Sequence, residues 1–287
     1  MNTEIIKIQP GDGPVSEEDD AKLKAAGEIL RRGGLVAFPT ETVYGLGGDA
    51  LNPTSSKRIY AAKGRPSDNP LIVHIYRFED IYKITGDVPE EARRIADAFW
   101  PGPLTMILPK SDAVPYETTG GLDTVAIRMP SHPVAAQLIR TSGVYIAAPS
   151  ANISGKPSPT RGEHVIHDMK GRIDMIIVDD TVDIGVESTI VDLSEDVPTI
   201  LRPGYITKEM LSEVLGEVRI DPAIMGSVKP GVVPKAPGMK YRHYAPKAPV
   251  TVVTGPAEAS ACTIEQLAKP GDGVICFDEF ADRFDQQ

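Results

Sequence analysis

The sequence predicts an α/β protein in which one twisted mixed β-sheet with covering helices occupies roughly residues 1–220. Short apolar runs alternate with amphipathic segments, and their spacing suits hairpins in some places and helical crossovers in others. The composition then changes, because no acid occurs between Ala223 and Ala257 while prolines recur there. We therefore expect a domain at 1–220, a Pro-rich basic linker at 221–249 and a small C-terminal unit at 250–287.

The overall composition is that of a soluble globular protein, with 41% hydrophobic and 24% charged residues. No apolar run is long enough for a transmembrane helix, and no signal-peptide pattern opens the chain. The only cysteines, Cys262 and Cys276, favour a reducing compartment over a disulfide framework or a cysteine zinc site. The net charge of −10 disfavours a general nucleic-acid coat, so an anionic ligand requires a local cluster of cations. We predict a cytoplasmic protein without membrane contact.

The first helix is marked at both of its ends. Ser16 is a cap residue with Asp19 as its partner three positions on, and acids fill the positive first turn. Two arginines and then Gly33 and Gly34 end the helix, and a short apolar strand follows at 35–38.

The next segment contains a misleading match to a dinucleotide-binding fingerprint. Gly45, Gly47 and Ala50 fit G-x-G-x-x-A after a strand, but Pro53 interrupts the position of the required helix. Lys63 also stands about where an acid would bind the ribose. We therefore reject a Rossmann cofactor site and interpret the glycines as places where the backbone passes close to a ligand or another strand.

A short helix at 54–62 leads into the basic stretch Lys63-Gly64-Arg65-Pro66, and a strand follows at 71–75. Proline restricts its own φ and the residue before it, so we expect Lys63 and Arg65 to lie on a stiff loop. Two convergent cations on such a loop suit a polyphosphate, although a solvated basic turn is the alternative.

The remaining elements alternate. We expect helices at 89–99, 133–140 and 208–215, and strands at 104–108, 124–129, 144–148, 175–178, 188–193 and 199–201. Arg128 and Arg202 each end an apolar strand before a proline-containing turn, so each can project from a sheet edge. Singly, each arginine is as consistent with a structural salt bridge. Together with the basic loop they suit a reaction whose cost is electrostatic, such as attack of an anion on a phosphate.

The linker is richer in aromatic and basic residues than a spacer requires, so we interpret it either as a tether or as a strap that closes over a site. Beyond it, strands at 250–253 and 274–277 around a helix at 257–267 would form one βαβ unit. Some forty residues cannot bury a core of their own. The unit is therefore expected to dock on the main domain or to represent the beginning of a larger one.

Several motifs together resemble the threonylcarbamoyl-AMP synthase family. They are PTETVYGLGGDA, K-G-R with DNPLIVHI, FWPGPLT, PSANISG, ESTIVD, LRPG and PGMKYRHYAP, and they span roughly residues 1 to 250. The resemblance is to two-domain members with a YrdC-like catalytic domain, a linker and a Rossmann-like C-terminal domain, which would be incomplete here. It implies that L-threonine, bicarbonate or CO2, and ATP are joined into threonylcarbamoyl-adenylate with release of pyrophosphate. That product would serve the threonylcarbamoyl modification of the tRNA adenosine beside the anticodon.

The resemblance also implies roles for individual residues. The catalytic positions would be Lys63, Arg65, Ser150 and Asn152. Lys63, Arg65 and Ser150 would also bind ATP, with Asn69, Thr124, Ala148, Ser158, Arg202, Tyr241 and His243. L-threonine would be bound by Thr42, His74, Arg128 and Ser188. Mg²⁺ is expected to enter with ATP, since no set of protein metal ligands is evident. The expected partner is a downstream tRNA threonylcarbamoyl transferase complex, with a weak direct tRNA contact as a further expectation.

Two alternatives stay open at this point. YrdC-like domains resemble double-stranded-RNA-binding modules, although the acidic net charge disfavours that role here. A carbamoyl-adenylate-forming enzyme with another acceptor is the second alternative, but the hydrogenase maturation proteins of that kind carry zinc-finger and acylphosphatase segments that this chain lacks.

Overall fold

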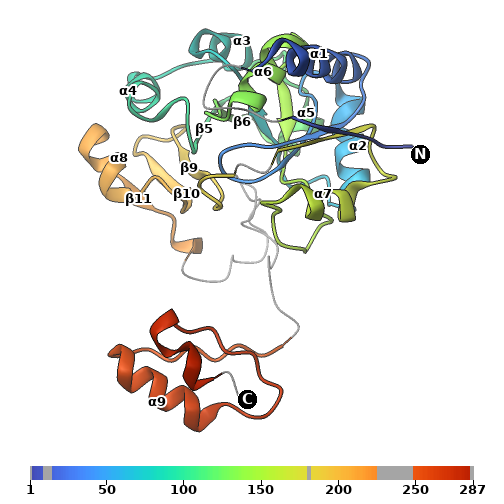
Figure 1. The fold of residues 1–287 in the computed structure, drawn as a ribbon. Coiled ribbons are helices and arrows are strands. Elements are labelled where there is room, and N and C mark those ends of the chain that lie inside the picture. The colour runs from blue at the N-terminus through green and yellow to red at the C-terminus, as the bar shows by residue number, and fades with distance from the viewer. Residues whose placement is uncertain (1, 9–14, 180–181, 225–247, 285–287) are drawn as a thin grey trace. The chain divides into compact units, whose positions relative to one another are not determined.

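The computed structural model describes residues 2–8, 15–179, 182–224 and 248–284. The chain divides into two compact units, Met1–Tyr244 and Ala245–Gln287 (Figure 1). None of the helices within the described ranges is both long enough and apolar enough to cross a bilayer.

The described residues of the first unit form one mixed eleven-stranded sheet in the order β1-β8-β2-β3-β7-β4-β6-β5-β9-β10-β11. Its strands are β1 (Glu4–Lys7), β2 (Val36–Phe38), β3 (Gly45–Asp49), β4 (Ile72–His74), β5 (Leu104–Pro109), β6 (Thr124–Arg128), β7 (Ile146–Ala148), β8 (Met175–Val178), β9 (Thr189–Asp192), β10 (Thr199–Arg202) and β11 (Arg219–Ile220). The α-helices are α1 (Glu17–Arg31), α2 (Pro53–Lys63), α3 (Ile81–Ile84), α4 (Glu90–Phe99), α5 (Tyr116–Thr119), α6 (Pro133–Ser142), α7 (Gly162–Met169) and α8 (Lys208–Leu215). Short 3-10 helices occupy Phe78–Asp80 and Pro222–Ile224.

Side chains alternate across this sheet and divide the core between its two faces. On one face Ala37, Val73 and Ile127 belong to the large cluster that also contains residues of α2, α4 and α7. On the other face, residues of β2, β7 and β8 pack against those of α1 and α6. A small separate cluster contains Ile72 and Ala126. The mixed sheet with helices that the sequence predicts is therefore confirmed.

The predicted cap at the start of α1 is confirmed, and a glycine that was not predicted as a cap ends α2. The Ser16 hydroxyl accepts a hydrogen bond from the backbone N–H of Asp19 at 3.1 Å and so caps α1. Gly64 adopts a left-handed conformation with φ 62° and ends α2. The expectation that Lys63 lies on a loop is wrong, because the helix continues through Lys63. A glycine C-cap follows the last helical residue, so only Arg65 belongs to the stiff loop.

The glycine-rich segment forms a strand of the sheet, which the sequence did not predict as one. A Cβ added to Gly47 would lie 2.7 Å from Ile146 Cγ2 and 2.9 Å from Phe38 Cε1. The interpretation that these glycines permit close approach to another strand is therefore confirmed. The strand itself was missed because glycines carry no alternating apolar pattern. The short β1 was missed as well.

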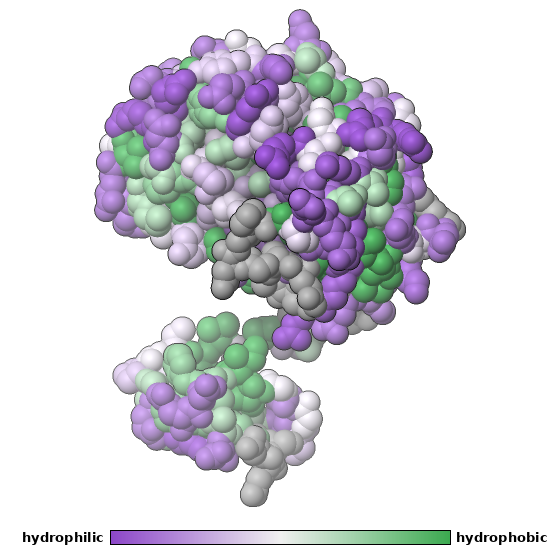
Figure 2. Space-filling model, turned by 45° about the horizontal axis from the view of Figure 1, so that its top comes forward, coloured by the Kyte–Doolittle hydropathy of each residue, from purple (hydrophilic) through white to green (hydrophobic). Residues whose placement is uncertain are grey.

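The second unit differs from the prediction. It contains helix α9 (Ala257–Leu267) and a 3-10 helix at Asp278–Arg283. Residues 250–253 and 274–277 form no strand, so the two predicted strands are wrong and no βαβ unit is formed by the described residues. A strand is stable only beside others that complete its hydrogen bonds, and an isolated pair is marginal in water. Figure 2 shows apolar side chains on the surface of this unit, and Val252 and Ile275 are 77% and 98% exposed.

Candidate active site

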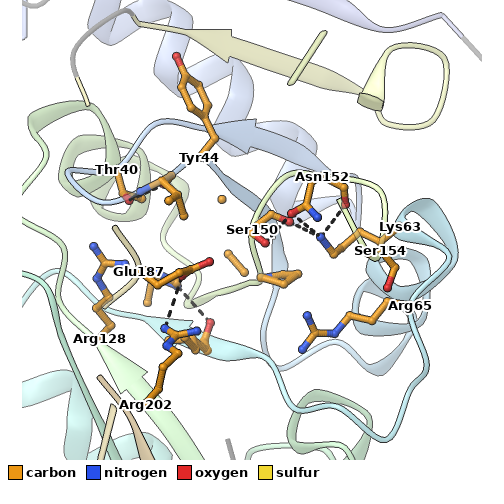
Figure 3. Close-up of a pocket in the computed structure, with 17 residues that line it drawn as sticks. Thr40, Tyr44, Lys63, Arg65, Arg128, Ser150, Asn152, Ser154, Glu187 and Arg202 are labelled. Atoms are coloured by element: carbon orange, nitrogen blue, oxygen red, sulfur yellow. Dashed lines mark hydrogen bonds and ion pairs between the residues drawn. The ribbon is translucent and has the colours of Figure 1, made fainter. Parts of the chain in front are cut away.

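A cavity of about 170 Å³ opens on the first unit. Its wall combines the loop before β3, the end of α2, strands β4, β6 and β7, the turn after β7, the residue Glu187 just before β9, and Arg202 at the end of β10 (Figure 3). The residues that line it are Thr40, Val43, Tyr44, Gly45, Lys63, Arg65, Ile72, His74, Arg128, Ala148, Pro149, Ser150, Asn152, Ser154, Gly155, Glu187 and Arg202.

Strand register brings four of these side chains together. His74 pairs with Arg128 of the parallel strand β6 and with Ile146 of the antiparallel strand β7. Ile72, two residues before His74, pairs with Ala148 and points to the same face. One strip of the sheet therefore presents a cation, an imidazole and a small apolar surface to the cavity.

Lys63 holds the turn after β7. Its ammonium donates to the backbone carbonyls of Ser150 and of Asn152, the latter at 2.7 Å, and lies 3.3 Å from Asn152 Oδ1. The Ser150 hydroxyl donates to the same Oδ1 at 2.6 Å. Burial, together with the charge of Arg65, lowers the pKa of Lys63 to about 7. The Lys63 charge is therefore sensitive to pH and to any anion that enters the cavity.

The same turn is tied to α7 through a carboxylate. Asp168 accepts from the Lys156 ammonium at 2.6 Å and from the backbone N–H of Ile153 at 3.1 Å. The Asn152 side-chain amide donates to the carbonyls of Ile153 and Lys156. These bonds hold the turn in one conformation against the helix.

Two further cations of the wall, Arg65 and Arg202, are also oriented by hydrogen bonds. Arg65 donates to the carbonyls of Asn69 and Pro70 at 3.3 and 3.2 Å. Arg202 donates to the Ser188 carbonyl at 3.0 Å and to the Ser188 hydroxyl at 2.9 Å. The guanidinium groups are therefore held in fixed directions before any ligand binds.

Glu187 is the one carboxylate on the described wall of the cavity. It lies 3.5 Å from Arg202 Nη2, and its other oxygen accepts from the Ser158 hydroxyl at 2.6 Å. Since Lys63, Arg65, Arg128 and Arg202 face this single acid, the cavity favours anions within a protein whose net charge is −10.

His74 is neutral at physiological pH. Burial, together with the nearby charge of Arg128, lowers the pKa of His74 to about 4. Its Nδ1 lies 3.1 Å from the Ile72 carbonyl and 3.3 Å from that of Ile146. Because carbonyl oxygens only accept, we assign the proton to Nδ1, which leaves Nε2 as an acceptor.

The structure brings most of the predicted site residues to one place. Those that line the cavity are Lys63, Arg65, His74, Arg128, Ala148, Ser150, Asn152 and Arg202. Four more lie directly behind the wall and contact it: Thr42 through Thr40, Asn69 through Arg65, Ser158 through Glu187, and Ser188 through Arg202. Thr124 is not on the wall, because it begins β6 while Arg128 ends it. Tyr241 and His243 lie outside the described residues.

Sequence reasoning named Thr42 from the loop at 40–44 but missed Glu41 and Tyr44. Glu41 is buried behind the wall, with its carboxylate 2.8 Å from Arg128 Nη2. The Tyr44 hydroxyl accepts from the backbone N–H of Asp179 at 2.9 Å and donates to the Asp179 carbonyl. The available signal was an acid placed among threonines in PTETVYG, where a solvated surface residue is not expected.

Family models match both parts of the chain. A model described as telomere recombination, which joins the Sua5, YciO and YrdC proteins, matches residues 28–204. A second model, described as the C-terminal domain of threonylcarbamoyl-AMP synthase, matches residues 206–287.

Two similar proteins carry the name threonylcarbamoyl-AMP synthase. Threonylcarbamoyl-AMP synthase of Pyrococcus abyssi is 55% identical over 249 residues, or 87% of this chain and 73% of the relative. That of Bacillus subtilis is 50% identical over 266 residues, or 92% and 76%. The crystal structure of P. abyssi Sua5 complexed with L-threonine superposes with a TM-score of 0.86 at 52% identity, covering 92% of this chain and 76% of that one.

A more distant structure shares only the fold. Escherichia coli YciO superposes with a TM-score of 0.62 at 23% identity, over 71% of this chain and 96% of YciO. The extent of the family match and the identity to two synthases confirm the family that the motifs predicted. The chain belongs to the threonylcarbamoyl-AMP synthase family.

Proposed function

We propose that the protein joins L-threonine, bicarbonate or CO2, and ATP into L-threonylcarbamoyladenylate and releases pyrophosphate. The observation that carries this proposal is the division of cations in one cavity. Lys63 and Arg65 lie on one side of Figure 3, Arg128 lies on the other, and Arg202 lies between them in this view. Such a cavity suits two anionic reactants that must meet.

The amino-acid end would be the strip formed by β4, β6 and β7. Arg128 can bind a carboxylate through two parallel hydrogen bonds, as a planar guanidinium does best. His74 Nε2 offers an acceptor for a hydroxyl or an amine, and Ile72 and Ala148 offer apolar surface for a methyl group. A carboxylate, a hydroxyl and a methyl group on one small molecule describe threonine. The related P. abyssi protein has been crystallised with L-threonine.

The chemistry would proceed in two bond-forming steps. The threonine amine attacks the carbon of CO2, loses a proton and becomes a carbamate. A carbamate oxygen then attacks the α-phosphorus of ATP, and the bond from that phosphorus to the bridging oxygen breaks as pyrophosphate leaves. Lys63, Arg65 and Arg202 would offset the repulsion between the two anions. No side chain forms a covalent bond, so positioning and charge supply the catalysis.

Magnesium would be bound chiefly by the triphosphate. No group of three or more His, Cys, Asp or Glu in the described residues could hold an ion. Glu187 offers one carboxylate, which fits an ion that keeps its waters and phosphate oxygens. When bound, such an ion would reduce the negative charge of the phosphates.

We also propose a role for the product in tRNA modification, on the basis of the family to which the chain belongs. The product would pass to a tRNA threonylcarbamoyl transferase complex that modifies the adenosine beside the anticodon, with a weak tRNA contact as an additional proposal. The free thiols of Cys262 and Cys276 are consistent with a reducing, cytoplasmic location.

The test is pyrophosphate release from ATP, Mg²⁺ and bicarbonate, with and without L-threonine. We expect release only when threonine and bicarbonate are both present, with serine a poor substitute. If ATP is cleaved whether or not threonine is present, the result would favour the alternative of an enzyme that forms a carbamoyl-adenylate with another acceptor. Tight RNA binding at moderate salt without any turnover would favour the RNA-binding alternative.

A further inference from the structure

We propose that Glu41 is a positioning residue for the amino-acid substrate: its carboxylate holds the Arg128 guanidinium so that Arg128 can receive the substrate carboxylate. This inference rests on the proposed function, because it assumes that Arg128 binds the carboxylate of threonine. It adds a role for a residue that does not itself line the cavity.

Burial sets the Glu41–Arg128 pair apart. The side chains are 5% and 4% exposed, and Arg128 Nη2 lies 2.8 Å from Glu41 Oε1. In every other pair of an arginine or lysine with a carboxylate in the described ranges, at least one side chain is considerably more exposed. Burial raises the pKa of Glu41, but the charge of Arg128 lowers it further, so Glu41 is ionised when the cavity is empty. A buried cation without this partner would be costly to desolvate.

The pair leaves hydrogen-bonding capacity unused on the arginine. Arg128 Nη2 lies 2.8 Å from Glu41 Oε1, but Arg128 Nε has no hydrogen-bond partner in the described residues. Buried donors without acceptors are rare in folded proteins and often mark a site that a ligand completes. Arg128 also lines the cavity, so its guanidinium joins Glu41 to the space where the substrate would bind.

The loop that carries Glu41 is too well anchored for the carboxylate to swing away easily. The Glu41 carbonyl accepts from the backbone N–H of Ile184 at 2.9 Å. The Thr40 hydroxyl donates to the Val43 carbonyl at 2.6 Å, and Tyr44 is bonded to the backbone of Asp179 through its hydroxyl. A fixed acid beside a long arginine side chain acts as an orienting partner.

The experiment compares two substrates that differ only in the group that Arg128 would bind. L-threoninamide keeps the amine and the side chain of threonine but has no carboxylate. In the wild-type chain, kcat/KM for L-threonine should greatly exceed that for L-threoninamide. In Glu41→Gln this ratio should fall about tenfold, which is the effect expected from a weakened charge-assisted contact. KM for ATP should change less than about twofold, because Arg65 and Arg202 are untouched.

Two further variants complete the design. Glu41→Asp keeps the charge but withdraws it by one methylene, so the ratio should fall less than in Glu41→Gln, and this variant carries the test if Glu41→Gln does not fold. Glu117→Gln removes the acid of an exposed pair with Lys57 and should leave the ratio unchanged.

The outcomes separate the inference from the proposed function. A wild-type substrate ratio in both Glu41 variants overturns the role of Glu41, as does a rise in that ratio, which would make Glu41 a competitor of the substrate. Equal losses for the two substrates would show a purely structural role and overturn it as well. A wild-type chain without threonine-dependent pyrophosphate release overturns the proposed function instead.

Discussion

Lys63 is buried, and its surroundings destabilise the positive charge of its ammonium group. Burial and the Arg65 charge lower its pKa to about 7, while an unfolded lysine titrates near 10.5. Between these two values the unfolded chain binds more protons than the folded chain, so this group makes the protein more stable as the pH rises. The proposed function instead requires a low enough pH for Lys63 to stay charged, because a neutral amine cannot offset the negative charge of a phosphate.

This conflict leads to a prediction about pH. As the pH rises above about 7, kcat/KM for ATP should fall because Lys63 loses its proton. Initial rates between pH 6 and 9 would test this, with Lys63→Arg as the matched variant, since arginine stays charged throughout that range. The alkaline decrease should be absent from whatever activity Lys63→Arg retains. An identical decrease in both proteins would assign the titration to another group.

Arg128 should distinguish the two substrates. Arg128→Lys keeps the charge but loses the planar fork, so KM for threonine should rise about tenfold while KM for ATP changes little. Steady-state kinetics with each substrate varied in turn would measure both constants. Equal effects on the two values would argue against recognition of a carboxylate at this position.

At the scale of the element, the positions and pairing of the short strands determine which side chains reach the cavity. Ile72 and His74 reach it because they are two residues apart on β4, and Arg128 and Ala148 reach it because β6 and β7 flank that strand in register. A slip by one residue would turn each of these side chains to the opposite face. The site therefore depends on tight packing between strands.

Gly47 is the glycine of β3 at which an added side chain would have least room. Gly47→Ala places a Cβ 2.7 Å from Ile146 Cγ2, so we expect a loss of about 1–3 kcal/mol in the free energy of unfolding. Gly86→Ala is the matched control, since its Cβ would lie 3.5 Å from the Lys110 carbonyl oxygen. Urea denaturation would compare the two. Equal stability in both variants would show that β3 tolerates a side chain at this position.

At the scale of the whole molecule, the first unit holds nearly all of the described core. Its three apolar clusters lie within residues 6–224, and Ala261 is the only buried apolar residue described in the second unit. The first unit should therefore fold without the second one.

A chain ending at Ile224 tests this expectation together with the interpretation of the linker as a strap, or lid, that closes over the site. Its thermal unfolding should remain cooperative, because the clusters are intact. Adenylate synthesis should be lost if Tyr241 and His243 close over the nucleotide as predicted, because water would then reach the carbamate and the mixed anhydride. Full synthesis by the shortened chain would remove the lid from the mechanism, and a non-cooperative transition would contradict the independence of the first unit.

The sequence by itself was sufficient for features that depend on neighbours along the chain. The cap at Ser16 and the arginines that end β6 and β10 follow from residue types within a few positions, and the motifs were specific enough to identify the family. Only the tertiary structure decided the Glu41–Arg128 pair, the lowered pKa of Lys63 and the absence of strands around α9. Each of these depends on which distant segments lie side by side. Burial and strand pairing are set by the register of the whole sheet, and local sequence does not encode that register.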